Sequence, residues 1–245
     1  MDKKLTVALC LSGEPRSSMF CFPYIYEAFL KPNPIFETDV YIHSWKGFRA
    51  LEIYNPTHLK TENISDSFIG NIMYTLKFPP DLQNQLNFYN AYTKNTNFIF
   101  NQVKMMYSIQ KCFNLIQKEY DIVIRCRYDI IFNNRDFINS ILYDIINKKY
   151  DIFIPYSNNF NFQNQGEYND QLAIGNYDSM KIYSNLLSDL PTILPHSKRW
   201  SSENFLKILL EKNNIKVNQH YINHRLVRQS NIITNEGEFN NFLDE

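Results

Sequence analysis

Short apolar runs alternate with longer stretches of helical periodicity along most of the chain. Each short run is bounded by polar or turn-forming residues, as buried strands are, and strands are predicted at 5–11, 39–45, 121–127, 150–156 and 171–175. Apolar residues three or four apart predict helices near 17–30, 101–120, 136–148, 176–189 and 202–213. This alternation predicts an α/β fold with a mainly parallel central sheet and helices on both faces. We expect a single domain at 1–230 and a polar, acidic tail at 231–245.

Length, charge and cysteine usage narrow the class of protein. A domain of 245 residues can bury about 70–75 % of its unfolded surface, so a large core is available. Lys plus Arg and Asp plus Glu both number 25, and this balance argues against bulk binding of nucleic acid. No apolar run approaches the roughly 18 residues of a membrane span. Cys10, Cys21, Cys112 and Cys126 lack metal-binding spacing, which favours a reduced, cytoplasmic setting.

Polar residues gather at the end of each early strand. They occur in SGEPR (12–16), HSW (43–45), RCRYD (125–129) and PYSNN (155–159). Ligands of parallel α/β sheets bind beyond the carboxyl ends of the strands. The sequence therefore predicts one site that collects these polar groups.

The most unusual of these strand ends is YDIVIRCRYDII (120–131). Side chains alternate along a strand, so Arg125, Arg127 and Asp129 are expected on one face, about 6.6 Å apart. A carboxylate there could hold a divalent cation, and guanidinium groups could pair with phosphate oxygens and neutralise a departing nucleoside diphosphate. The alternative is a structural Arg–Asp network at the sheet edge. We favour the functional interpretation, because one carboxylate cannot easily satisfy two guanidinium groups.

The first two strand ends offer further candidates. Ser12, Gly13 and Arg16 could cradle a phosphate or a ribose at the start of a helix, although many ordinary strand-to-helix turns contain Gly and Pro. His43 and Trp45 could line a pocket for a nucleotide base, or could belong to the core.

Acidic and histidine residues in the second half leave more alternatives open. Glu167 or Asp170 could accept a proton from an acceptor hydroxyl or steady a cationic sugar, or could simply cap a turn. Glu203 suits the first turn of a helix, where the dipole favours an acid, and it could also face the site. His220 and His224 are expected at the solvated surface, with a metal-ligand role as the minority alternative.

Taken together, these segments resemble small GT-A-type glycosyltransferases that occur in bacterial surface-polysaccharide clusters and in large DNA viruses. The resemblance covers LCLSGEPR, DVYIHSW, YDIVIRCRYDIIF, YNDQLAIG and SENFLKILLEKNNIKV, and it spans roughly residues 5–228. Its most specific part combines an Arg-x-Arg-x-Asp strand end with a Ser-Gly-x-x-Arg opening. Residues 46–100 contain no matching motif.

The resemblance implies a nucleotide-sugar donor bound across the first half of the sheet, with Mn²⁺ or Mg²⁺ at the position usually written DxD. Asp129 matches the second acid of that motif, whereas Arg127 replaces the first and would help stabilise the departing diphosphate. Asp170 would lie on the acceptor side as the candidate base. Residues that would face the donor are Ser12, Gly13, Arg16, His43 and Arg125.

The predicted function is transfer of a sugar from a nucleoside diphosphate to a hydroxyl of a glycan, on a surface polysaccharide or a glycoprotein. The alternatives are transfer of a phosphorus-containing or nucleotidyl group at a similar site, and a non-catalytic module that binds nucleotides or glycans. The expected partners are a nucleotide-sugar donor and a glycan acceptor. The expected location is the cytoplasm, including a peripheral position at the inner face of the membrane.

Overall fold

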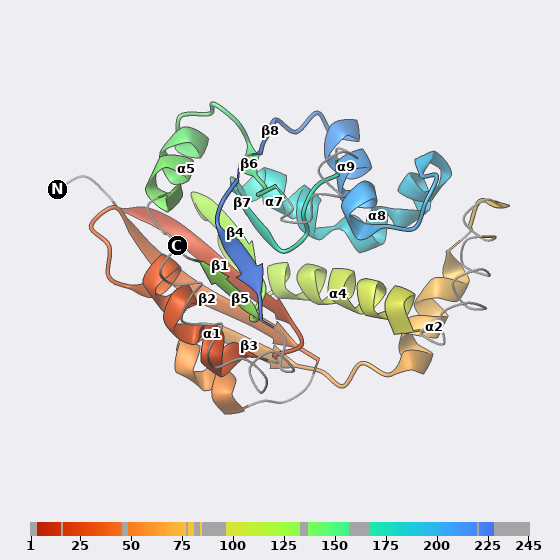
Figure 1. Ribbon diagram of the computed structural model, residues 1–245, viewed down its shortest axis with the longest axis horizontal. Coiled ribbons are helices and arrows are strands. Elements are labelled where there is room, and N and C mark those ends of the chain that lie inside the picture. The colour runs from red at the N-terminus through yellow and green to blue at the C-terminus, as the bar shows by residue number, and fades with distance from the viewer. Residues whose placement is uncertain are drawn as a thin grey trace.

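The computed structural model describes residues 4–15, 17–45, 49–76, 78–80, 84, 97–132, 137–156, 167–219 and 221–227. Its centre is a seven-stranded sheet in the order β3-β2-β1-β4-β7-β6-β8 (Figure 1). The strands predicted at the beginning and the middle of the chain thus become neighbours in space.

The first half of the sheet is parallel. Strand β1 (Leu5–Gly13) lies between β2 (Phe36–Ser44) and β4 (Ile122–Cys126), and β3 (His58–Thr61) pairs with β2 at the edge. The middle strands are buried and rich in Val, Ile and Leu, as is typical of parallel strands covered on both faces. The carboxyl ends of β1, β2 and β4 therefore point to one edge.

The second half of the sheet reverses direction. Strand β7 (Leu172–Gly175) is antiparallel to β4 and to β6 (Ile152–Phe153), while β8 (Val217–Asn218) is parallel to β6. In the β4–β7 register, Cys126 lies opposite Leu172. The residues that precede β7 consequently lie beside the carboxyl end of β4.

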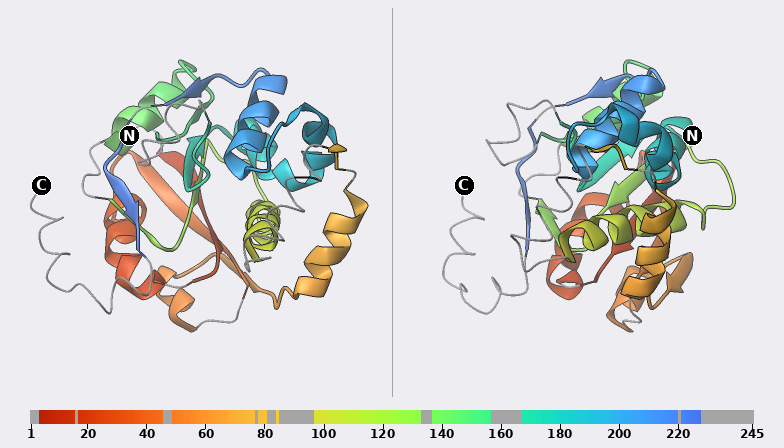
Figure 2. Two further views of the ribbon diagram at one scale, coloured as in Figure 1. Left: turned by 45° about the vertical axis from the view of Figure 1, so that its right-hand side comes forward. Right: turned by 90° about the vertical axis from the view of Figure 1, so that its right-hand side faces the viewer.

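Helices cover both faces of the sheet (Figures 1 and 2). Alternation along β1 sends Val7, Leu9 and Leu11 into one core cluster and Ala8 and Cys10 into the other. The first cluster is covered by α1 (Ser18–Ile25), the π-helix Tyr26–Leu30, the 3₁₀-helix Arg49–Tyr54 and α5 (Phe137–Ile146). The second is covered by α2 (Asp66–Thr75), α4 (Asn97–Phe113), α7 (Tyr177–Ser184), α8 (Leu186–Ile193), the 3₁₀-helix Leu194–His196 and α9 (Ser202–Lys212). The predicted fold class is confirmed.

A second, two-stranded sheet joins distant parts of the chain. Strand β5 (Ile130–Phe132) pairs antiparallel with β9 (His224–Leu226), and the two lie side by side in Figure 1. Just beyond β9, the Val227 N–H donates to the Asp129 carbonyl oxygen at 2.8 Å, and the Ser17 hydroxyl donates to the Val227 carbonyl oxygen at 2.9 Å. This late segment therefore ties the start of α1 to the turn after β4.

The end of β4 differs from the prediction. Arg125, Arg127 and Asp129 were expected on one face of a continuous strand, but β4 ends at Cys126 and the chain turns at Tyr128 and Asp129. The Arg127 and Asp129 side chains lie in direct contact, not one strand repeat apart. The expectation of evenly spaced charges was wrong, because local sequence pattern does not reveal where the strand stops.

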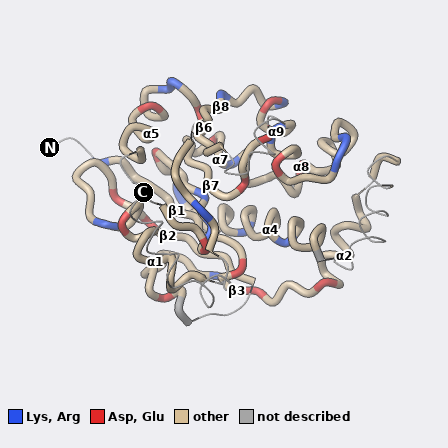
Figure 3. The backbone as a smooth tube through the Cα atoms, viewed as in Figure 1, with Lys and Arg blue, Asp and Glu red and all other residues tan. Residues whose placement is uncertain are grey.

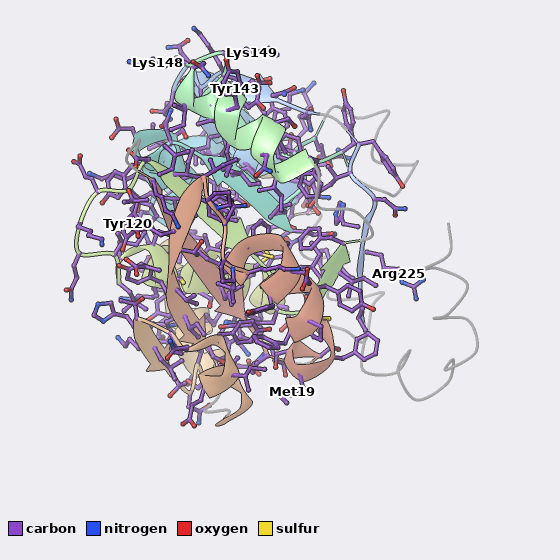
Figure 4. The ribbon with its side chains drawn as sticks, turned by 90° about the vertical axis from the view of Figure 1, so that its left-hand side faces the viewer. Met19, Tyr120, Tyr143, Lys148, Lys149 and Arg225 are labelled. Carbon is purple, nitrogen blue, oxygen red and sulfur yellow. The ribbon has the colours of Figure 1, made fainter. Side chains whose placement is uncertain are left out.

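The surface shows no dominant charge. Acidic and basic residues are both spread over the described elements (Figure 3). Two exposed apolar residues on the α1/α5 face, Met19 and Tyr143, lie far apart in Figure 4. Scattered residues of this kind are ordinary on protein surfaces. Within the described residues, no helix has the length and apolar character that crossing a membrane requires.

Candidate functional site

A cavity of about 320 Å³ opens at the carboxyl ends of β1, β2 and β4. Segments from seven parts of the chain form its wall. The lining residues are Ser12, Gly13, Glu14, Trp45, Phe98, Asn101, Gln102, Met105, Arg125, Arg127, Tyr128, Asp129, Asp170, Gln171, Ser202, Glu203 and Leu226. The cavity lies where ligands bind in parallel α/β sheets.

Arg125 lines this cavity while being almost completely buried. Only 1 % of the residue is exposed. Nη1 donates a hydrogen bond of 2.5 Å to the Gln171 carbonyl oxygen, whereas Nε and Nη2 have no hydrogen-bond partner among the described residues. A buried guanidinium with unsatisfied N–H groups is costly, because water and a counter-charge have both been lost. The cavity is therefore suited to an anionic group that accepts hydrogen bonds.

Other buried polar atoms of the cavity residues also lack partners among the described residues. They are Ser12 Oγ, Trp45 Nε1 and Gln102 Oε1, which come from β1, from the residue after β2 and from α4. Buried donors and acceptors are normally satisfied in folded proteins. The cavity therefore offers both hydrogen-bond donors and an acceptor, which a ligand that carries hydroxyl groups could satisfy.

Gly13 shapes the turn after β1. Its φ of +120° is a conformation that residues with a Cβ rarely adopt, and a Cβ built there would meet nothing within 4 Å. Backbone conformation, not space, therefore requires glycine here.

Arg127 and Asp129 form a bidentate ion pair at the cavity wall. Arg127 Nε donates to Asp129 Oδ1 at 2.7 Å, and Nη2 donates to Oδ2 at 2.9 Å. Burial lowers the pKa of the Arg127 guanidinium, but its bonds to Asp129 and the charges of Asp129 and Asp170 raise that pKa overall. This pair corresponds to the structural Arg–Asp network that was the alternative interpretation of the sequence. Arg125, by contrast, has N–H groups left to donate to a ligand.

A divalent metal fits the described residues poorly. Both carboxylate oxygens of Asp129 accept hydrogen bonds from Arg127. Among the described residues, no three His, Cys, Asp or Glu side chains come together in a way that could hold a metal ion. Mg²⁺ and Mn²⁺ prefer several oxygen ligands in octahedral geometry. We therefore derive no chemistry from a metal at Asp129.

Asp170 enters the cavity because β7 is antiparallel. It precedes β7, whose first residues lie beside the end of β4, and its Oδ2 accepts a hydrogen bond of 2.7 Å from the Ser202 hydroxyl. Ser202 and Glu203 belong to the first turn of α9, which is capped by Ser201 accepting from the Asn204 N–H at 3.2 Å. The geometry thus collects two carboxyl groups on the wall that faces Arg127.

His43 and Trp45, which were both predicted for a base pocket, occupy different places. Trp45 lines the cavity. His43 does not; it is fully buried, and its Nδ1 lies 2.8 Å from Ser108 Oγ on α4. Burial lowers the pKa of His43, although Glu62 opposes the effect. The predicted contact between His43 and a nucleotide-sugar donor is therefore not supported by the lining of the cavity.

The remaining candidates are distributed as follows. Arg16 and His220 lie outside the described residues. Glu167 forms an ion pair with Arg199 and is not part of the cavity lining. His224 was expected at the solvated surface, which is wrong: it is buried, and its Nε2 lies 3.3 Å from Gln171 Oε1.

Several lining residues were not predicted from the sequence. Gln171 and Ser202 neighbour predicted candidates and were not themselves singled out. Asn101, Gln102 and Met105 were predicted only as part of an amphipathic helix at 101–120, and Phe98, which also lies on α4, precedes that predicted helix. The adjacent polar residues Asn101 and Gln102 were the available signal.

The fold defines an α/β protein with a cavity beyond the carboxyl ends of a parallel half-sheet. No family profile and no curated protein sequence matches the chain. Mouse xyloside xylosyltransferase 1 is similar to it with a TM-score of 0.47, 10 % identity, and coverage of 89 % of this chain and 85 % of that one.

Two further solved structures are similar at the same level. A protein described as a nucleotide-diphospho-sugar transferase from Desulfovibrio desulfuricans has a TM-score of 0.44 and 12 % identity, covering 99 % of this chain and 98 % of that one. A CMP:2-keto-3-deoxy-manno-octonic acid synthetase has a TM-score of 0.46 and 10 % identity, with 95 % of both chains covered. Likeness this loose assigns no substrate and no residue role to the present chain.

Proposed function

We propose that the protein transfers a sugar from a nucleoside-diphosphate sugar to a hydroxyl group of a glycan acceptor. The observation that supports this most is the buried guanidinium of Arg125, whose Nε and Nη2 lack partners among the described residues at the wall of the cavity. A diphosphate supplies both the negative charge and the acceptor oxygens that this group lacks. The neutral hydroxyl, indole N–H and amide oxygen of Ser12, Trp45 and Gln102 suit the sugar and ribose hydroxyl groups of such a donor.

In the proposed reaction, the acceptor oxygen bonds to the anomeric carbon of the donor sugar. The bond from that carbon to the diphosphate oxygen breaks, and the nucleoside diphosphate leaves with the electron pair. Arg125 stabilises the negative charge on the leaving group, while Arg127 stays bound to Asp129. If the configuration inverts, Asp170 accepts the proton of the attacking hydroxyl. If it is retained, an oxygen of the departing diphosphate takes that proton, and Asp170 positions donor or acceptor.

Ligand-induced stabilisation tests the donor class. UDP-, GDP- and CMP-sugars are each added with Mn²⁺, with Mg²⁺ or with EDTA, and the melting temperature is recorded. We expect one nucleotide family to stabilise the protein, by about 2.7 kcal/mol at a hundredfold excess over the dissociation constant. Stabilisation that persists in EDTA would show that no divalent ion is required for binding, whereas its loss would support the metal site predicted from the sequence.

Product analysis then tests the reaction. Sugar transfer releases free nucleoside diphosphate and lengthens a glycan acceptor by one sugar. Release of pyrophosphate with formation of a new nucleotide sugar would instead identify a nucleotidyltransferase. Tight binding without turnover on any acceptor would identify a binding module. If no nucleotide sugar stabilises the protein, the proposed function is wrong.

A further inference from the structure

The hydroxyl of Ser202 lies between two carboxyl groups of the cavity. Its Oγ is 2.7 Å from Asp170 Oδ2 and 3.1 Å from Glu203 Oε2. Only 1 % of Ser202 is exposed, so water has little access to relieve the contact. A serine hydroxyl has one hydrogen to donate and two lone pairs that accept. It therefore cannot donate to both carboxylates at once.

The neighbouring hydroxyl of Ser201 supplies one further hydrogen. Ser201 Oγ is 3.0 Å from the same Glu203 Oε2 and can donate to it, whereas Glu167 Oε1 is more distant at 3.4 Å. The contact of 3.1 Å between Ser202 Oγ and Glu203 Oε2 still holds no hydrogen when Ser202 donates to Asp170 and Glu203 is ionised. If Glu203 were ionised, its oxygen would face the lone pairs of Ser202 and the charge of Asp170. If Glu203 is protonated, its O–H donates to Ser202 Oγ and the Ser202 O–H donates to Asp170. The shorter distance to Asp170 fits this direction.

We propose that Glu203 carries a proton and, through the hydroxyl of Ser202, positions the carboxylate of Asp170 in the cavity. The role of Asp170 in proton transfer rests on the proposed function, whereas the proton on Glu203 does not. Glu203 is thus a positioning residue that acts through Ser202.

The charged surroundings are consistent with one proton on this pair. Burial, and secondarily the charge of Asp170, raises the pKa of Glu203 above its ordinary value, although its hydrogen bonds to Ser201 and Ser202 oppose the rise. Tyr183 of α7 faces the pair as a neutral hydroxyl, because burial raises its pKa. On the β4 side, the charge of Asp170 contributes to raising the pKa of Arg127, which is bound to Asp129. Arg125 lies on the same cavity wall as Arg127, and the nearby Glu167 is paired with Arg199.

The proton affects ligand binding through the charge of the cavity. With Glu203 protonated, a departing diphosphate meets one negative charge on this wall; with Glu203 ionised, it meets two. Nucleotide affinity should therefore fall as the pH rises through the raised pKa of Glu203. One additional negative charge about 4 Å from the diphosphate should raise the dissociation constant about fivefold in a water-like dielectric.

Infrared spectroscopy of the ligand-free protein tests the proton directly. A protonated carboxyl group has a carbonyl stretch that a carboxylate lacks, and its loss is followed from about pH 4 to pH 8. We expect the wild type to keep one acid band above the ordinary glutamate midpoint of about 4.3, and Glu203→Gln to lose it. Glu211→Gln, on an exposed position of the same helix, is the control and should remove only an ordinary component.

A second variant and a second measurement keep the inference open to refutation. Asp170→Asn should lower the midpoint of the remaining band, because the neighbouring charge is gone. Stability gives an independent readout: a carboxyl whose folded pKa is raised contributes fully below its unfolded pKa and loses that contribution as pH rises through the folded pKa. The melting temperature of the wild type relative to Glu203→Gln should therefore fall with pH. An ordinary midpoint for the Glu203 band, or a midpoint unchanged by Asp170→Asn, overturns the inference.

Nucleotide titration separates this inference from the proposed function. UDP, or whichever nucleoside diphosphate stabilises the protein, is titrated at several pH values into wild type and Glu203→Gln. We expect affinity to fall with pH in the wild type and to stay constant in the variant. An acid band without nucleotide binding would contradict the proposed function alone, whereas pH-independent binding by the wild type would contradict the role given to Glu203.

Discussion

At the scale of single residues, Arg125 has lost its water on folding and has recovered only part of its hydrogen bonding. Its Nη1 is bound to Gln171, while Nε and Nη2 remain without partners among the described residues. Arg199 presents the opposite case, because it is paired with a Glu167 carboxylate that is 3 % exposed. Two arginines near one site should thus respond differently when their charge is removed.

We expect Arg125→Met to separate binding from stability. Loss of hydrogen bonds to a charged ligand should weaken nucleotide binding by about 1.5–3 kcal/mol, or roughly 10- to 150-fold. The melting temperature of the ligand-free protein should stay constant or rise, because an incompletely satisfied buried charge disappears. Arg199→Met is the control and should lower stability by about 1–3 kcal/mol, since it leaves the buried Glu167 unpaired. A destabilised Arg125→Met that binds nucleotide normally would mark Arg125 as structural.

At the scale of elements, the direction of β7 decides which residues reach the site. The LAIG segment (172–175) reads as a strand from its composition, but four apolar residues look alike in a parallel and an antiparallel strand. The sequence therefore predicted Asp170 as a candidate, but it did not reveal that the antiparallel direction of β7 brings this residue to the cavity. The same holds for α4, whose periodicity was visible while its orientation toward the cavity depended on packing.

Local pattern was most informative where one physical cause dominates. The buried strands β1, β2 and β4 follow from continuous apolar runs, and Arg125 stood out because a charged residue is costly in a buried strand. The end of β4 at Cys126 could not be predicted from the sequence. The chain turns after it into β5, and β5 pairs with β9, where Phe132 lies opposite His224, about 92 positions further along the chain. Long-range pairing of this kind leaves no local trace in a single sequence.

Two glycines provide a test of packing at this scale. Gly175 ends β7, and a Cβ there would lie 2.7 Å from Ser179 Oγ and 3.1 Å from the Asp151 carbonyl oxygen. We expect Gly175→Ala to destabilise the protein by about 1–3 kcal/mol, as overpacking does. Gly70 lies within α2 with nothing within 4 Å of its Cβ position, so Gly70→Ala should stabilise by about 0.5–1 kcal/mol. Denaturant unfolding of both variants measures the two signs.

At the scale of the whole molecule, the contact between Ser17 and Val227 joins residues 210 positions apart. Both residues are buried, and the adjoining Val227 N–H also binds the carbonyl of Asp129. Leu226 of β9 lines the cavity. Residues 221–227 therefore contribute to the wall of the cavity through Leu226.

We expect Ser17→Ala to loosen this wall. The variant leaves the buried Val227 carbonyl without its hydroxyl partner, which should lower stability by about 1–3 kcal/mol and speed hydrogen exchange of the β5 and β9 amides. Ser140→Ala is matched, because it removes an exposed hydroxyl bonded to the Phe137 carbonyl oxygen at 2.8 Å and should change stability by less than about 0.5 kcal/mol. Equal exchange rates in the two variants would show that β9 is held by other contacts.

Translation gives the Ser17–Val227 contact a temporal meaning. Ribosomes add about 5–20 residues per second, so roughly 10–40 seconds separate the emergence of these two partners. During that interval β1, β2 and β4 can already associate, while the guanidinium of Arg125 stays hydrated because β7 and β9 have not yet been added. Arg125 loses this water only when these last strands fold against the sheet. A nascent chain would thus complete this cavity in one late step, and ribosome-bound intermediates halted before β9 should fail to retain the nucleotide that the protein is proposed to bind.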